Sequence, residues 1–164
     1  MTIKELVSTN AQAQLLMTVP GISYYSALLI LSEIGKIERF PSAKHLSSYA
    51  GLVPSVYSSG SKSFHGRITK QGSRWLRWIC VEISIHAANG DARFQSLYRR
   101  VLRRRGLATA KVAVTRKILT VIYAMLKNNE PFRRRRPRQQ ILAKAWSKKS
   151  QESSGHPAGV MIQA

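Results

Sequence analysis

The sequence is poor in the residues that most often hold metals or cross-link a chain. It contains one cysteine, Cys80, and seven acidic side chains among 164 residues. A single cysteine excludes a disulfide framework within the chain and a zinc site built on cysteine pairs, and it favours a reducing, cytoplasmic location. The seven acids are scattered, whereas a two-metal nuclease needs several carboxylates around ions about 4 Å apart. We therefore expect this chain alone to bind no metal and no other cofactor.

Long apolar runs are also missing. No segment approaches the roughly 20 apolar residues that a membrane-spanning helix needs, so no membrane association is expected. The segment from Met1 to Leu16 lacks an uninterrupted apolar core and a cleavage site, so it does not fit a signal peptide. The basic run near the end of the chain lacks the continuous apolar face of a helix that lies on a membrane surface.

Positive charge, in contrast, is abundant and segregated. Lysine and arginine number 27, which gives a formal net charge of +20 and a pI near 11.2. Three stretches without any acid, residues 51–78, 93–117 and 133–149, hold 22 of these 27 cations. Cations gathered in this way are the electrostatic footprint of a nucleic-acid-binding protein. The charge pattern therefore predicts nucleic acid, DNA or RNA, as a partner.

Apolar residues recur with helical spacing, and no segment alternates as a strand does, so the sequence predicts an all-α fold of about six helices. We expect a helical domain over residues 1–128 and a basic, disordered tail over 129–164. The domain divides into a helix-hairpin-helix-like element over 2–35, a basic Gly/Ser loop over 51–72 and basic helices over 73–127. The individual helices are predicted at residues 2–19, 23–35, 40–51, 73–88, 92–105 and 107–127.

Capping and core positions support these boundaries. Thr2 and Glu5 form a capping-box pair, Ser23 and Asp91 are expected N-caps, and Gly106 should end a helix. Residues expected on buried helix faces are Cys80, then the stripe Phe94, Leu97, Val101 and Leu102, and in the last helix Ala110, Val114, Ile118, Val121, Ile122 and Met125.

The turn between the first two predicted helices reads Pro20-Gly21-Ile22-Ser23. Gly21 permits a backbone that exposes N–H groups at the start of the second helix, and such groups bind anions. This helix-hairpin-helix reading predicts nucleic-acid contact at Gly21, Ile22 and Ser23. The same tetrapeptide also fits an ordinary turn between two helices, and the sequence leaves both readings open.

The stretch from Gly51 to Trp78 combines hydroxyls, glycines and cations without an acid. We expect residues 51–70 to be irregular or to carry at most a short hairpin. A serine can attack a phosphodiester when it is exposed and when cations stabilise the charge on the pentacoordinate phosphorus. Ser59 meets these conditions, since Gly60 follows it and Lys62, Arg67 and Lys70 lie close in sequence.

Other interpretations of this stretch remain open. Ser58 and Ser61 meet the same conditions almost as well, and loop serines are often no more than polar filler. His65 is the one nearby group that titrates close to neutral pH and could act as a base. Further contacts with nucleic acid are predicted on the following helices, at Arg74, Arg77, Arg99, Arg100, Arg103, Arg104 and Lys111.

Four motifs follow one another along the chain: LMTVPGISYYSALLILSEIG, FPSAKHLSSYAGLVP, SSG and GRITKQGSRWLR. Together they resemble the C-terminal transposase domain of the insertion-sequence one-ten family (IS 110/116/902 type), the RNA-guided bridge recombinases. The similarity extends from Leu15 to Lys127 and includes the closing KVAVTRKILTVIYAMLK.

The resemblance implies a two-part enzyme from a bacterium or archaeon. An N-terminal RuvC-like half would carry a DEDD set of acids that binds Mg²⁺, and a helical C-terminal half would supply a serine nucleophile. DNA strands would be exchanged through a covalent phosphoserine link, with a guide RNA and a homo-oligomer as further partners. The nucleophile of the family falls on Ser59-Gly60, and its basic motif falls on Arg67, Lys70, Gly72 and Arg77.

Two departures from the family pattern matter. Ser23 stands where the family hairpin has a second glycine, which weakens the predicted phosphate contact there. The DEDD half is missing, so we expect a C-terminal fragment or a truncated reading frame that is inactive in isolation. The alternatives are a non-catalytic DNA- or RNA-binding module and a truncated remnant of a mobile element.

Overall fold

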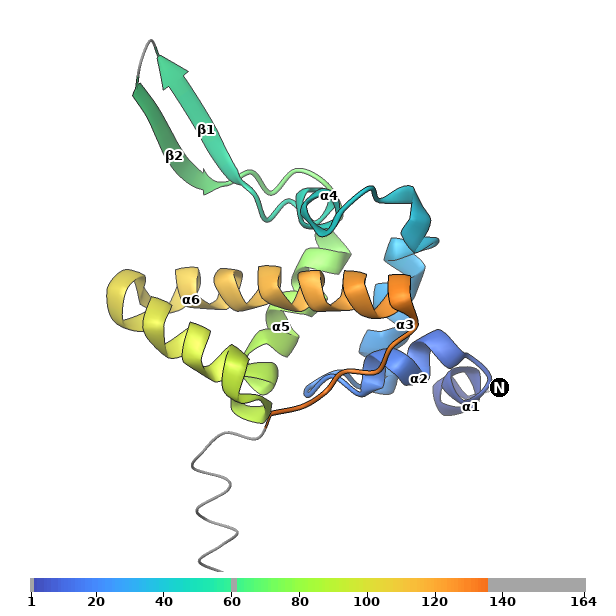
Figure 1. Ribbon diagram of the computed structural model, residues 1–164. Coiled ribbons are helices and arrows are strands. Elements are labelled where there is room, and N and C mark those ends of the chain that lie inside the picture. The colour runs from blue at the N-terminus through green and yellow to red at the C-terminus, as the bar shows by residue number, and fades with distance from the viewer. Residues whose placement is uncertain (1, 60–61, 136–164) are drawn as a thin grey trace, which may run out of the picture.

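The computed structural model describes residues 2–59 and 62–135. Gly60, Ser61 and the predicted tail from residue 136 onward lie outside this range. The fold is all-α apart from one two-stranded sheet, as predicted (Figure 1). The elements are α1 (Ile3–Ser8), α2 (Ala11–Met17), α3 (Tyr24–Ile34), η1 (Ile37–Arg39), α4 (Ala43–Tyr49), β1 (Pro54–Ser59), β2 (Lys62–Ile68), α5 (Arg74–Gly90) and α6 (Ala92–Asn128).

The helices pack around one apolar core, from which the β1–β2 hairpin projects (Figure 1). Burial of apolar side chains is the main force that holds such helices together. The largest fully buried side chains come from α1 to α6 and the segments between them: Val7, Leu16, Val19, Ile30, Ile34, Leu46, Leu52, Leu76, Phe94, Ile118, Leu119 and Ile122.

The first predicted helix is in fact two helices. Thr2 and Glu5 form the expected capping box, with Glu5 Oε2 accepting from the Thr2 N–H at 2.8 Å. The helix ends at Ser8, however, and the Asn10 side chain accepts from the Ala13 N–H at 3.0 Å to start α2. The prediction of one helix over 2–19 was wrong because serine, threonine and asparagine side chains compete for backbone groups and favour caps over helix interiors.

Glycine at the predicted ends was a reliable signal. Gly35 ends α3 with φ 59° and Gly51 follows α4 with φ 66°, both in the left-handed region that glycine adopts without strain. Gly106 has φ 82° and ψ 176° and divides α6 into two arms, residues 92–105 and 107–128. The predicted pair of helices is confirmed, and the arms fold back on each other at a sharp elbow (Figure 1).

The apolar stripe on the first arm of α6 is only partly buried. Phe94 is buried, but Leu102 is 37% exposed. Leu102 lies one turn before the elbow at Gly106, which extends beyond the helical body (Figure 1). In the second arm, Ala110, Val114, Ile118, Ile122 and Met125 are buried as predicted, while Val121 is half-buried.

The sequence predicted that the chain leaves the domain at residue 129. Residues 130–135 instead pack back on the start of α6 (Figure 1). We call this segment the strap. The Phe132 ring stacks on Phe94 with centroids 5.7 Å apart, and the Phe132 N–H donates to Thr18 Oγ1 at 2.9 Å. The Arg134 side chain donates to the Gly90 carbonyl at 2.6 Å. The basic composition of this segment concealed the apolar anchor at Phe132.

The fully buried carboxylate of Asp91 joins the strap to α6. It caps α6 by accepting from the Arg93 N–H at 2.9 Å, as predicted, and it accepts from the Arg135 N–H at 2.6 Å. The Arg93 guanidinium donates to the same carboxylate at 3.1 Å and to the Arg133 carbonyl at 2.7 Å. Burial alone would raise the pKa of Asp91, but hydrogen bonds from Arg93 and Arg135 and the charge of Arg93 outweigh it, so the pKa is lowered.

Two further expectations concern single features. Cys80 is buried in the core, as predicted, and burial raises the pKa of its thiol to about 12, so the thiol stays protonated at neutral pH. Among the described helices, none is long and apolar enough to cross a membrane.

Replacing the Asp91 carboxylate should destabilise the fold in a pH-dependent way. We expect Asp91→Asn to lower the free energy of unfolding by about 1–3 kcal/mol near neutral pH, since hydrogen bonds to a charged acceptor are lost. The pKa of Asp91 is lower in the folded than in the unfolded chain, where it is about 3.9, so its contribution is complete above about pH 4 and is lost as the pH falls through the folded pKa.

Urea unfolding of the parent chain and the Asp91→Asn variant at a series of pH values measures this difference. It should be constant from neutral pH to about pH 4 and shrink below that. A difference that persists unchanged in acid, or is absent at neutral pH, would show that Asp91 does not hold the strap through its charge.

Candidate nucleic-acid interface

The β1–β2 hairpin carries the predicted nucleophile. The two strands pair antiparallel, with Ser59 opposite Lys62, Val56 opposite His65 and Pro54 opposite Ile68. An irregularity between Pro54 and Val56 accommodates one extra residue. Ser59 is the last residue of β1, so it lies near the tip of a hairpin that projects from the helical body (Figure 1).

The hairpin separates Ser59 from two of the cations predicted to act with it. The Arg67 carbonyl accepts from Ser55 Oγ at 3.0 Å, which places Arg67 at the level of Ser55. Ser55 and Ser59 are four strand residues apart, and at 3.3 Å per residue this is about 13 Å. Lys70 lies further from the tip, beyond the end of β2, in the left-handed region with φ 55°. The structure thus pairs Ser59 with Lys62 and leaves Arg67 and Lys70 at the foot of the hairpin.

The backbone at this foot is held in close contact with α4 and α5. The Lys70 N–H donates to the Gly51 carbonyl at 3.1 Å, and the Ser73 N–H donates to the Tyr49 carbonyl at 2.7 Å. A Cβ on Gly72 would overlap the Tyr49 carbonyl, and a Cβ on Gly51 would overlap the backbone at Lys70. Both glycines also have positive φ, 66° at Gly51 and 110° at Gly72, so larger residues are excluded twice over.

Arg77 has a structural role that the sequence did not predict. Its Nη1 donates to the Ala50 carbonyl at 3.0 Å and to the Lys70 carbonyl at 3.1 Å, and the side chain is half-buried. It therefore joins α5 to both ends of the hairpin. The position of Arg77 in a basic motif gave no sign of these two carbonyls, and its predicted contact with nucleic acid stays a prediction. Arg74 and Arg67, in contrast, are exposed.

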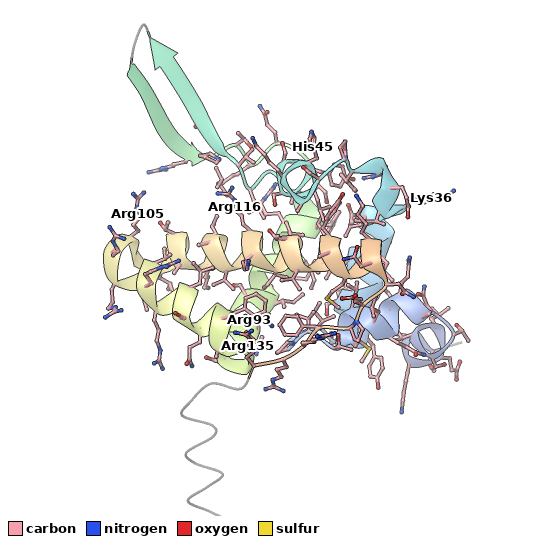
Figure 2. The ribbon with its side chains drawn as sticks, viewed as in Figure 1. Lys36, His45, Arg93, Arg105, Arg116 and Arg135 are labelled. Carbon is pink, nitrogen blue, oxygen red and sulfur yellow. The ribbon has the colours of Figure 1, made fainter. Side chains whose placement is uncertain are left out.

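Most predicted cations on α6 face solvent. Arg99, Arg100, Arg103 and Arg104 are exposed on the first arm, while Lys111 is half-buried on the second. Arg105 marks the elbow between the arms (Figure 2). Arginines in this arrangement present guanidinium groups along a helix, which suits contact with successive phosphates.

The two arms of α6 also border a basic groove that sequence reasoning found only in part. One hollow of about 490 Å³ is lined by Arg93, Arg100, Lys117 and Arg135, among others. An adjoining hollow of about 370 Å³ shares Leu97 and Lys117 and adds Lys44 and Arg116. Arg93 and Arg135 lie together at the start of α6, and Arg116 lies on the second arm (Figure 2). Four of these cations belong to the acid-free stretch 93–117, which the sequence analysis had singled out. Lys44 and Arg135 lie far from that stretch in sequence, and the fold brings them to the same groove.

In the turn between α2 and α3, two of the N–H groups predicted to bind an anion already have acceptors within the protein. The Ile22 N–H donates to the Val19 carbonyl at 3.2 Å, and the Ser23 N–H donates to Ser26 Oγ at 2.7 Å. Gly21 faces α5, where a Cβ would overlap His86. Ser23 instead caps α3 with Ser26 as its partner. These contacts favour the ordinary turn over the predicted anion site at Gly21, Ile22 and Ser23.

The described residues do not fit a metal ion. Within residues 2–59 and 62–135, no three histidine, cysteine or carboxylate side chains gather closely enough to hold one. Asp91, the one carboxylate in this range that forms an ion pair, is fully buried and saturated by Arg93 and Arg135. The chemistry of this surface is therefore that of cations, hydroxyls and aromatic rings.

Comparison with known proteins shows the family to which this chain is similar. A family model described as "Transposase IS116/IS110/IS902 family" matches residues 13–99, from α2 to the first arm of α6. The chain is 30% identical over 135 residues to the transposase for insertion sequence element IS1111A of Coxiella burnetii, covering 80% of this chain and 37% of that protein.

Two other relatives give the same picture. The pilin gene-inverting protein of Moraxella bovis is 33% identical over 135 residues, which cover 77% of this chain and 40% of that protein. A 43.6 kDa protein of insertion element IS110 from Streptomyces coelicolor is 31% identical over 137 residues, 82% of this chain and 34% of that protein. The chain thus spans between a third and two fifths of the length of these relatives.

The structural role of Arg77 can be separated from a binding role by comparison with Arg67. We expect Arg77→Ala to lower the free energy of unfolding by about 1–3 kcal/mol, because two carbonyls at the foot of the hairpin lose their donor. Arg67→Ala, at an exposed position, should change it by less than about 0.5 kcal/mol. Urea denaturation measures both. Equal effects of the two variants would mean that Arg77 does not brace the hairpin.

Proposed function

The chain belongs to the IS116/IS110/IS902 family of transposases, and from this premise we propose that it is the serine-bearing, DNA-acting domain of a recombinase. The observation that carries the proposal is that the family match spans the β1–β2 hairpin, which holds Ser59 away from the helical body. The names of the relatives, a transposase and a gene-inverting protein, both denote rearrangement of DNA segments.

In the proposed reaction the Ser59 hydroxyl attacks a phosphodiester. A bond forms between Ser59 Oγ and the 5′-phosphate while the bond to the 3′-oxygen breaks. The serine proton leaves, the 3′-oxygen gains a proton, and a phosphoserine link to DNA results. Attack by the 3′-hydroxyl of another strand on this link reverses the step and completes the exchange. The link conserves the energy of the phosphodiester, so no other energy source is required.

The cations divide into two groups in this proposal. Lys62, the register partner of Ser59, belongs to the end of the hairpin that meets the scissile phosphate. Arg67, about 13 Å away, contacts a flanking phosphate of the same DNA, about four base pairs along a duplex that rises 3.4 Å per step. Lys70, beyond the end of β2, contacts a phosphate further along. Arg67 and Lys70 were first expected to stabilise charge at the attacked phosphorus. In this proposal they position the DNA instead.

The whole enzyme is proposed to need a second part. Because the described residues do not fit a metal, we assign no metal-dependent step to this chain. The acids implied by the family resemblance would belong to an N-terminal half, and the relatives are long enough to contain one, since this chain covers 37% and 40% of two of them. A guide RNA and assembly into an oligomer belong to the same proposal.

A non-catalytic role has one observation in its favour. The groove between the arms of α6, with Arg93, Arg100, Lys117 and Arg135 on its walls, needs no reactive group to bind a phosphate backbone. A domain that used only this groove would hold DNA or RNA for another protein. The two functions differ in whether Ser59 becomes covalently linked to DNA.

Capture of a covalent adduct distinguishes them. The 164-residue chain is incubated with a nicked suicide substrate and an acid-bearing N-terminal half from a family member, and the adduct is mapped to a peptide by mass spectrometry. We expect a phosphoserine at Ser59, which Ser59→Ala abolishes without changing DNA affinity by more than about twofold, since a single hydroxyl contributes little to backbone binding.

Ser58→Ala and Ser61→Ala are the matched controls. Both should retain the adduct if Ser59 is the nucleophile. Loss of the adduct in one of these variants, with Ser59→Ala reacting normally, would move the nucleophile to the neighbouring serine. Retention in all three would reject these serines as the nucleophile. Absence of any adduct with the parent chain, although DNA is bound, would leave the binding module as the function.

A further inference from the structure

Two tryptophans on the first turns of α5 lie on its solvent side. Trp75 is 52% exposed and Trp78 is 45% exposed, although large aromatic side chains normally bury most of their surface. Leu76, Ile79 and Cys80 in the same turns are buried and supply the contacts with the core. The tryptophans are thus not needed for the core, and their rings offer apolar faces to a ligand.

The two rings form a corner. Their centroids are 6.2 Å apart and their planes meet at 85°. With Arg74, Arg77 and Val81 they line a hollow of about 460 Å³. A planar group that stacks on one ring meets the edge of the other. This geometry suits one flat group and does not suit a continuous stack of several.

The charges around the corner indicate what kind of group it takes. The Arg74 guanidinium lies 5.4 Å from the Trp75 centroid, and Arg77 is fixed beside it by the Ala50 and Lys70 carbonyls. Along the chain no acid occurs between residues 51 and 78, and Glu82 lies one turn beyond Trp78. In space, Glu33 Oε2 accepts from Ser73 Oγ at 2.7 Å at the start of α5, and the two guanidinium groups of Arg74 and Arg77 outnumber this one carboxylate. An occupant is therefore anionic at the Arg74 end and flat and apolar at the tryptophans, which describes a nucleotide.

We propose that Trp75 and Trp78 form a stacking site for an unpaired nucleotide, with Arg74 and Arg77 at its phosphate. The base must be unpaired, because the faces of bases in a duplex are already covered by their neighbours. The site rests on the proposed nucleic-acid function and adds single-stranded DNA or RNA to its substrates. It lies at the foot of the hairpin, since α5 begins directly after Gly72 and Ser73.

Tryptophan fluorescence tests the site directly. The protein used is the full chain with Trp146→Phe, so that all tryptophan emission comes from Trp75 and Trp78. The probes are a 12-nucleotide oligo(dT), an oligo(rU) of equal length, an abasic strand with the same number of phosphates, and a 12-base-pair duplex. Oligo(dT) should quench the emission and the abasic strand should not. The ratio of oligo(dT) to oligo(rU) affinity then identifies whether DNA or RNA is preferred.

Affinities of variants give the second measurement. Trp75→Ala with Trp78→Ala should weaken oligo(dT) binding by roughly 5- to 150-fold, as expected for loss of base stacking, and change duplex affinity by less than about twofold. Phenylalanine at both positions should restore most of the affinity, because stacking needs only an aromatic face. Ile85→Ala, at an exposed apolar position further along α5, is the control and should have no effect.

The outcomes separate this site from the proposed function. Arg103→Ala with Arg104→Ala should weaken strand and duplex binding alike, since phosphate contacts do not depend on pairing. If strand and duplex both bind but the tryptophan variant changes neither, the stacking site is overturned and the proposed function stands. If neither probe binds, both are overturned. If the tryptophan variant instead dissociates a protein oligomer in analytical ultracentrifugation, the corner is a protein interface and the proposal is wrong.

Discussion

The close approach of backbone segments at the foot of the β1–β2 hairpin is the constraint on which the functional surface depends. Gly51 and Gly72 allow the chain to pass within contact of Tyr49 and Lys70, where no side chain would fit. Arg77 then ties the Ala50 and Lys70 carbonyls to α5. With both ends of the hairpin fixed to one helix, the register of the two strands sets where Ser59, Arg67 and the tryptophan corner lie relative to one another.

The second constraint is electrostatic. A net charge of +20 on 164 residues repels itself, and acids that could offset it inside the fold are few. Within the described residues the fold uses one ion pair, between Arg93 and Asp91, and relies otherwise on apolar burial and helix caps. Several cations on the hairpin foot and on α6, among them Arg67, Arg74, Arg103 and Arg104, are exposed, which suits contact with phosphates. The strap likewise depends little on ion pairs. Phe132 and backbone hydrogen bonds, more than its arginine charges, hold it in place.

The sequence predicted what local chemistry decides. Thr2, Ser23 and Asp91 cap helices, and Gly35 and Gly106 end them, because caps and left-handed turns depend on a few neighbouring residues. It did not predict the break between Ser8 and Asn10, where polar side chains bind backbone groups and Asn10 caps a new helix. It also missed the strap, the role of Arg77 and the basic groove, since each depends on groups 27 or more residues apart, such as Arg77 and Ala50. For the site, composition singled out Ser59 and the cations, but only strand register shows that Arg67 lies far from Ser59.

The separation between Ser59 and Arg67 gives the most direct test. The hairpin fixes the distance between the phosphate that Ser59 attacks and the phosphates that position the DNA. In the adduct-forming reaction, single phosphates of the substrate are replaced by neutral methylphosphonates, and the yield is compared between the parent chain and an Arg67→Ala, Lys70→Ala variant. The account predicts that the variant loses sensitivity to neutralisation about four nucleotides and further from the cleavage site and keeps its sensitivity at the scissile phosphate and next to it. Loss of sensitivity at or next to the scissile phosphate would contradict it, because Arg67 and Lys70 would then lie beside Ser59 during the reaction.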